Sequence, residues 1–456
     1  MTTSATAGED LARIDAVRQA FPREGLFHEK EWLLSPRAFP LSNRFVDELE
    51  KLGYRLHLFQ RACNRLYQLS IKGKQPAWIA RYLDAGKPPE LVELSRERIF
   101  RDEIARIIRP DIIPTETGLT IAELDTVPGG IGLTAWFNRT YSALGDDVVG
   151  GPDGMLDGFA SIFPGGSIVV SQEAGTYRPE MQWLADTLNN RPQFDATDKA
   201  QPWKVVDTGE KSLLQHYDAA QAAGQPLSAY RFFEHFDLPN VPVAGWLMEQ
   251  ARAGRATVTP PFKPYLEEKM WFALFWLRPL REFWRRELSE RHFAELQKVI
   301  PYTWLMDPTV LPPHAVIPHL EVNEWAEVAG FSQKERELIV KISGFSELGW
   351  GSRSVSLGSD LSQEEWRQAI KEALGSFEQN PYLMQRFHKG RLVEQPYYDA
   401  HGEVQTMKGR VRLCPYYFVV DGKTQLRGAL ATVCPADKKL LHGMRDAIMV
   451  PAGLRE

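Results

Sequence analysis

The 456-residue sequence has little cysteine, no long apolar run and almost no excess of charge. Its three cysteines, Cys63, Cys414 and Cys434, stand far apart without a CxxC pair, which argues against a disulfide framework or zinc cluster and for a reducing compartment. The longest strongly apolar run, Met270 to Leu277, is too short to cross a bilayer, and the polar N-terminus lacks the apolar stretch of a secretion signal. These absences predict a cytoplasmic protein with no membrane partner.

The charge balance argues against nucleic acid as a partner. Lys and Arg together number 54 against 59 Asp and Glu, and the net charge is −5, so the sequence lacks the basic excess of proteins that bind bulk DNA or RNA. The common motifs GxxxxGK, GxGxxG, HExxH and GxSxG are also missing. A composition of 43% hydrophobic and 25% charged residues nevertheless predicts a soluble globular protein of two to four domains.

The spacing of apolar residues predicts different secondary structure in different regions of the chain. Apolar residues recur at helical spacing over residues 42–71, where we expect helices broken near Gly53. Residues 111–114 and 119–125 read as two strands joined by a turn near Gly118. Residues 150–260 alternate strand and helix, with a helix expected over 230–236, and indicate a small Rossmann-like α/β layer. An α+β pattern follows it.

Three carboxylates fall on the predicted hairpin. Glu123 and Asp125 are two residues apart on one strand, so their side chains leave the same face. A turn near Gly118 brings Asp111 opposite Glu123. Converging carboxylates suit Mg²⁺, which takes oxygen ligands and shares the phosphates of a nucleotide. An exposed strand with solvated acids is the alternative, and the apolar neighbours weigh against it.

Basic residues in apolar strands form the second set of candidates. Lys341 closes the strand 338–340 and precedes a small-residue loop, residues 344–351, a pattern that suits phosphate binding but also an ordinary surface hairpin. Arg412 and Arg427 lie in strands that read as buried. A buried arginine requires an anion, either a protein carboxylate or a substrate phosphate, and both alternatives stay open.

Several of these segments resemble the ATP-grasp ligases in the circularly permuted form of glutathionylspermidine-synthase-like proteins. In that family, a strand pair of pattern R-x-D and E-x-N, followed by proline, binds the magnesium ions that bridge the ATP phosphates. Arg109-Pro-Asp111 matches the first motif. Glu123-Leu-Asp125 with Pro128 matches the second, except that aspartate stands where the family has asparagine, which leaves the number of metal ions open.

The later segments follow in the family's permuted order. The helix opening at Lys269 resembles the first lysine segment, and Lys341 with the loop of Gly349 and Gly351 resembles the second lysine and the phosphate-covering loop. Gln385 stands at the glutamine of the adenine-binding hinge strand. The resemblance implies an α+β ATP-grasp fold, and we expect four parts: an N-terminal helical segment (1–100), the metal-binding part of the core (101–165), an inserted small α/β substrate-side layer (166–260) and a nucleotide-binding lobe (261–456).

The resemblance also implies a reaction with ATP and Mg²⁺ as cofactors and a small-molecule carboxylate and amine as substrates. Expected metal ligands are Asp111, Glu123 and Asp125; expected nucleotide contacts are Lys269, Lys341, Gly349, Gly351 and Gln385; Arg109, Arg412 and Arg427 would steady the transferred phosphoryl group. Arg178, in a loop after a strand of the α/β layer, is a candidate for the substrate carboxylate. The alternatives are a non-catalytic nucleotide-binding scaffold and a phosphotransferase acting on a hydroxyl group.

Overall fold

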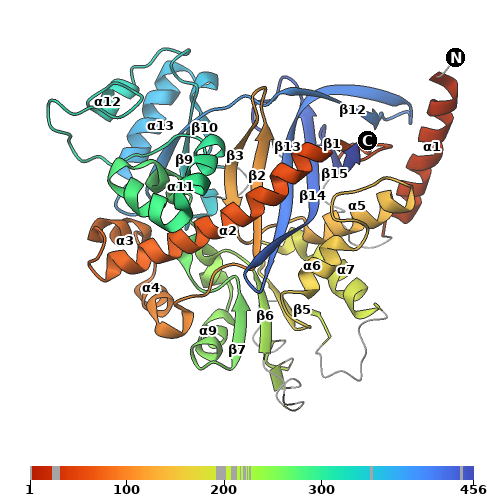
Figure 1. The fold of residues 1–456 in the computed structure, drawn as a ribbon, viewed down its shortest axis with the longest axis horizontal. Coiled ribbons are helices and arrows are strands. Elements are labelled where there is room, and N and C mark those ends of the chain that lie inside the picture. The colour runs from red at the N-terminus through yellow and green to blue at the C-terminus, as the bar shows by residue number, and fades with distance from the viewer. Residues whose placement is uncertain are drawn as a thin grey trace.

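The computed structural model describes residues 3–22, 31–191, 202–206, 213–215, 217–218, 222, 224, 227–349, 353–441 and 445–455. Over these residues the fold is mixed α/β with three sheets and three apolar cores (Figure 1). Its helices are α1 (Thr3–Ala20), α2 (Asn43–Ile71), α3 (Ala77–Leu83), α4 (Pro89–Arg96), α5 (Ile131–Ala143), α6 (Gly154–Ala160), α7 (Arg178–Asn189), α9 (Ala244–Arg252), α10 (Met270–Trp276), α11 (Arg281–Val299), α12 (Trp325–Val328) and α13 (Gln363–Gly375).

The largest sheet joins the two halves of the sequence. Along its path the order is β1 (Phe39–Ser42), β15 (Ile448–Arg455), β14 (Lys423–Pro435), β13 (Val404–Val420), β2 (Ile107–Pro114) and β3 (Leu119–Asp125), and β12 (Leu392–Tyr398) pairs with β13. The hairpin of β2 and β3 is therefore held at one edge by a strand almost 300 residues later in the chain. The strands expected within residues 261–456 divide between this sheet and a separate antiparallel one.

That second sheet has the order β10 (Ser356–Leu357), β9 (Leu338–Ile342), β11 (Tyr382–Arg386) and β8 (Thr303–Leu305). All its pairings are antiparallel, and Lys341 stands opposite Leu383. α13 packs on it through buried Trp366 and Ile370, and begins with a capping box between Ser362 and Glu365. Figure 1 shows this unit beside the hairpin of β2 and β3.

The third sheet is the small α/β layer that the sequence indicated. Its strands β5 (Lys204–Val206), β4 (Ser167–Val170), β6 (Leu227–Phe232) and β7 (Ala256–Thr259) are all parallel. The expected helix over residues 230–236 is wrong: β6 runs to Phe232, and a short 3-10 helix follows at His235–Asn240. All four residues from Tyr230 to Phe233 are buried, and three of them are aromatic, which fits a strand buried on both faces with no alternation of apolar and polar residues.

The long helix α2 crosses the large sheet and contacts α3, α11 and β14 (Figure 1). Ser42 caps its start by accepting a hydrogen bond from the backbone N–H of Phe45 at 3.3 Å. The expected break near Gly53 is absent, because Gly53 lies inside the helix against the ring of Tyr417. Within the described part of the chain, no helix combines the length and apolar content that a bilayer span requires.

Candidate functional site

One cavity of about 520 Å³ lies where the three sheets meet, within the size range of cofactor and small-molecule sites. The edge hairpin of the large sheet, the antiparallel sheet and the ends of strands in the parallel layer all contribute to its wall. Most of the expected site residues line it: the metal ligands Asp111, Glu123 and Asp125, the nucleotide contacts Lys269, Lys341, Gly349 and Gln385, and the catalytic arginines Arg109 and Arg412. Segments that are far apart in the sequence thus converge on one concave site.

The hairpin has the register that the turn near Gly118 predicted. Asp111 stands opposite Glu123, and Arg109 stands opposite Asp125, which confirms the expected pairing. A β-bulge follows, because Ile112 pairs with Ile121 and leaves Ala122 without a partner in the register. The bulge frees the carbonyl oxygen of Ala122, which accepts a hydrogen bond from Lys341 Nζ at 2.8 Å.

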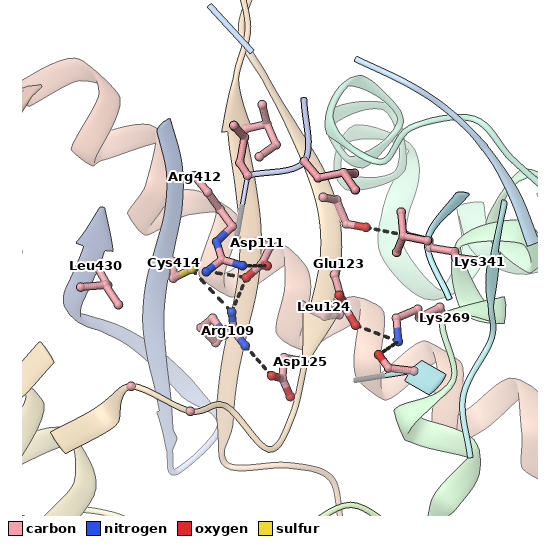
Figure 2. Close-up of a pocket in the computed structure, with 18 of the residues that line it drawn as sticks. Arg109, Asp111, Glu123, Leu124, Asp125, Lys269, Lys341, Arg412, Cys414 and Leu430 are labelled. Carbon is pink, nitrogen blue, oxygen red and sulfur yellow. Dashed lines mark hydrogen bonds and ion pairs between the residues drawn. The ribbon is translucent and has the colours of Figure 1, made fainter. Parts of the chain in front are cut away.

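Two arginines occupy one side of the hairpin. Arg109 pairs with Asp111 and, at 2.5 Å, with Asp125, while Arg412 from β13 contacts Asp111 at 3.1 Å (Figure 2). The Cys414 thiol lies within the same group, 3.3 Å from Asp111, and burial raises the pKa of Cys414 to about 11. Of the two anions that the sequence left open for Arg412, the structure supplies the protein carboxylate. The arginines remain on the cavity wall, within reach of a ligand.

Lys269 lies on the other side of the hairpin and contacts Glu123 at 2.8 Å (Figure 2). Burial disfavours its charge, but Glu123 and Glu234 outweigh that effect and raise the pKa of Lys269. Glu123 keeps 40% of its side-chain surface accessible, and this surface borders the cavity. Lys269, which directly follows Glu267 and Glu268 in the sequence, is therefore a paired lysine of the cavity wall and not a solvated lysine at a helix start.

Those two glutamates fix Lys269 in place. Glu267 pairs with Arg231 and with His235 Nδ1 at 2.7 Å, both in the parallel layer. Glu268 is buried, contacts Lys87 at 2.5 Å and accepts a hydrogen bond from the Ser343 hydroxyl beyond β9. Three consecutive charged residues thus connect the parallel layer, the antiparallel sheet and the hairpin, so Lys269 is held where these units meet.

Lys341 has a different environment from Lys269. Its ammonium group donates hydrogen bonds to Ala122 O and, at 3.0 Å, to Gln385 Oε1, and no carboxylate of the described residues lies within ion-pair distance of it. Burial lowers the pKa of Lys341 to about 8, although Glu123 opposes the shift. Gln385 in turn donates to the Thr303 hydroxyl at 3.1 Å. A buried cation held only by neutral oxygens is poised to receive an anion.

The three hairpin carboxylates do not converge into one metal cluster. Among the residues that the structure describes, no group of three acidic, histidine or cysteine side chains could hold a metal ion. The three carboxylates are instead held in separate ion pairs. Asp111 pairs with Arg109 and Arg412, Asp125 pairs with Arg109, and Glu123 pairs with Lys269. Magnesium commonly binds through one or two carboxylates together with waters and substrate phosphates, and the oxygens of Glu123 and Asp125 on the cavity wall fit that kind of site.

Other expected site residues are not brought to the cavity. Arg427 does not line it, and its guanidinium group contacts the Gln425 side chain at 3.0 Å on a partly exposed part of β14. The expectation of a buried strand failed there because β14 becomes buried only from Gly428 onward. Arg178 begins α7 and does not line the cavity, although Ala174 and Tyr177 just before it do. Gly351 lies outside the described residues.

The cavity also contains residues that the sequence did not single out. Phe232 ends β6, and Phe233 and Glu234 follow it, in the segment for which a helix was expected. Tyr177 and Gly130 contribute from the segments around α7 and α5. The signal that could have found Glu234 is its place directly after a parallel strand, where ligands bind in open α/β sheets.

With the geometry established, the solved structures place the fold among known proteins. A glutathione synthetase-like effector from Globodera pallida, solved in its apo form, aligns with 100% of this chain and 97% of its own at a TM-score of 0.53 and 10% identity. The two chains share a fold. A putative gamma-glutamylcysteine synthetase from Methylobacillus flagellatus aligns with 87% of this chain and 88% of its own, also at 10% identity, but at a TM-score of 0.38. No protein-family model and no curated protein matches the sequence.

Proposed function

We propose that the protein is an ATP- and Mg²⁺-dependent, ADP-forming ligase that joins a small-molecule carboxylate to an amine through an acyl phosphate. The proposal includes the circularly permuted ATP-grasp layout of glutathionylspermidine-synthase-like proteins. One observation carries it: a single cavity brings together the hairpin carboxylates with Lys269, Lys341, Arg109 and Arg412, which come from distant parts of the chain. Cations from both sides would surround a polyphosphate, while the carboxylates offer oxygens to a metal.

The shared fold supports the proposal. The glutathione synthetase-like effector covers nearly the same length, so the likeness extends over the whole chain and not over one nucleotide-binding segment. The order of the motifs adds to it, because Arg109-Pro-Asp111 and Glu123-Leu-Asp125 precede the two lysines. The fold alone does not give the reaction, and the residues of the cavity carry that step.

In this mechanism, Lys269 and Lys341 bind the phosphates of ATP, and Gln385 lies beside them on the hinge strand. Glu123, Asp125 and Asp111 would hold Mg²⁺, which would neutralise charge on the phosphates. Arg412 and Arg109 stabilise the phosphoryl group as it passes to the substrate carboxylate. The amine then attacks the acyl carbon, the C–N bond forms as the C–O bond to phosphate breaks, and phosphate leaves.

The loop of residues 344–349 borders the phosphate side of the cavity. Gly344 and Gly349 line it, and Gly349 O lies 3.5 Å from Lys269 Nζ. A small-residue loop in this place lets backbone N–H groups approach phosphates and excludes water from an acyl phosphate, which would otherwise hydrolyse. The loop therefore acts in the proposal as a cover over the reacting groups.

The experiment that tests the proposal incubates the protein with Mg·ATP and pools of carboxylates and amines, and follows ADP, phosphate and new amides by mass spectrometry. Glutamate, γ-glutamylcysteine, cysteine and glycine head the pools because they are the building blocks of glutathione, which the name of the glutathione synthetase-like neighbour contains. A ligase yields ADP, phosphate and amide in equal amounts. ADP without free phosphate would indicate transfer to a hydroxyl group, and ATP binding without turnover on any pool would indicate a scaffold.

A further inference from the structure

Glu234 is an acid of the cavity that no neighbour neutralises by direct contact. It follows β6, is half-buried and lines the cavity. Among the described residues, none lies within hydrogen-bond or ion-pair distance of its carboxyl group. The other acids of the cavity wall each have a cationic partner: Glu31, Asp111, Glu123, Asp125 and Glu267.

The surrounding charges keep Glu234 without a counter-ion. Lys269, whose charge acts on Glu234, is already paired with Glu123, and Arg231 is paired with Glu267. Burial and the neighbouring Glu267 raise the pKa of Glu234 to about 8, and Lys269 opposes the shift only in part. A ligand that brings its own positive charge would relieve this repulsion.

The walls next to Glu234 are aromatic. Phe232 and Phe233 line the cavity beside it, and the ring of Tyr177 lies 5.7 Å from that of Phe232. A carboxylate flanked by aromatic rings suits an alkylammonium group. The ammonium group would form an ion pair with the carboxylate, while its methylenes and N–H groups contact the aromatic rings. The place after a parallel strand is also where open α/β sheets bind small ligands.

We propose that Glu234 binds the amine substrate in its protonated ammonium form and accepts one proton from it, so that the neutral amine attacks the acyl carbon. The inference rests on the proposed function and adds the charge class of the second substrate. The two substrates then bind at different parts of one cavity according to their charge. The anionic phosphates bind Lys341, Lys269 and the arginines, and the ammonium group binds Glu234, which follows β6.

The test separates carboxylate activation from amine binding. Hydroxylamine, which is uncharged near neutral pH, traps an acyl phosphate as a hydroxamate without needing an ammonium subsite. Wild type, Glu234→Gln, Glu234→Asp and the control Glu249→Gln, an exposed acid on α9, are assayed with Mg·ATP and γ-glutamylcysteine or glutamate. Each is then given hydroxylamine, and separately glycine, cysteine or 1,4-diaminobutane as the amine.

We expect Glu234→Gln to form hydroxamate yet to raise the KM for the reactive amine by about tenfold or more, the loss typical of a charged hydrogen bond. Glu234→Asp keeps the charge and recovers part of this loss, and Glu249→Gln behaves as wild type. An unchanged amine KM in Glu234→Gln overturns the role of Glu234 but leaves the ligase intact. If wild type forms neither hydroxamate nor ADP with any probe, the proposed function itself fails, and this inference fails with it.

Discussion

At the scale of single residues, Lys269 and Lys341 have opposite electrostatic surroundings in the same cavity. Lys269 is paired with Glu123, whereas the partners of Lys341 among the described residues are neutral oxygens, and burial lowers the pKa of Lys341 to about 8. An arriving phosphate must compete with a carboxylate for the first lysine, but it supplies the missing anion for the second. Lys341 is therefore the lysine whose removal should weaken nucleotide binding most directly.

We expect Lys341→Met to weaken ATP binding by about 10- to 150-fold, because a charged hydrogen bond contributes roughly 1.5–3 kcal/mol. Isothermal titration calorimetry measures the change. Lys371→Met, an exposed lysine on α13, is the matched control and should bind as wild type does. An equal Kd for both variants would remove Lys341 from the nucleotide site.

The lowered pKa of Lys341 also predicts a pH dependence of binding. Only the protonated amine attracts phosphate, and its proton is lost as the pH rises through about 8. Affinity for ATP measured without metal should therefore fall between about pH 7 and pH 9, where an unperturbed lysine would stay charged. The slope should disappear in Lys341→Met. A wild-type affinity that is flat over this range would contradict the assignment.

At the scale of elements, Gly53 shows why a residue's local preference can mislead. Glycine weakens a helix, so a break was expected, yet α2 continues from Asn43 to Ile71. A Cβ at Gly53 would lie 2.4 Å from the ring of Tyr417 on β13. The glycine is present for close packing of the helix on the sheet, a contact between residues more than 360 positions apart that no local pattern contains.

We expect Gly53→Ala to destabilise the protein by about 1–2 kcal/mol, because overpacking costs about 1–3 kcal/mol and the gain in helix propensity returns at most about 1 kcal/mol. Urea unfolding measures the change. Gly245→Ala in α9, where a Cβ would meet nothing within 4 Å, is the control and should be neutral or slightly stabilising. A stabilised Gly53→Ala would show that the ring of Tyr417 moves freely.

Elements with strong local signals could be predicted, and those defined by distant partners could not. The hairpin of β2 and β3 and the strand β9 follow from apolar patterns and from the turn near Gly118. The segment of Glu234 was mistaken for a helix, because a doubly buried aromatic strand leaves no period to read. The bulge at Ala122 and the partial exposure of Arg427 depend on tertiary pairing and gave no sequence signal.

At the scale of the whole molecule, the cavity exists because three sheets converge. The sequence predicted many of the residues that line the cavity, but it did not predict how the sheets meet. The sequence analysis identified the acids of the hairpin, Lys269 and Lys341. It did not identify the ion pairs that hold the acids apart. The four expected parts, with boundaries at residues 100, 165 and 260, remain predictions. The large sheet takes strands from both ends of the chain, so its assembly could not be inferred from any single segment.

The central claim is that ATP activates a carboxylate in this cavity, and transfer of oxygen tests it most directly. A substrate carboxylate labelled with a heavy oxygen isotope is incubated with Mg·ATP, the amine and the protein, and the released phosphate is analysed by mass spectrometry. An acyl phosphate intermediate requires one labelled oxygen in each phosphate, since the carboxylate oxygen leaves with it. Phosphate that carries no label, released together with amide or without it, would contradict the proposed mechanism.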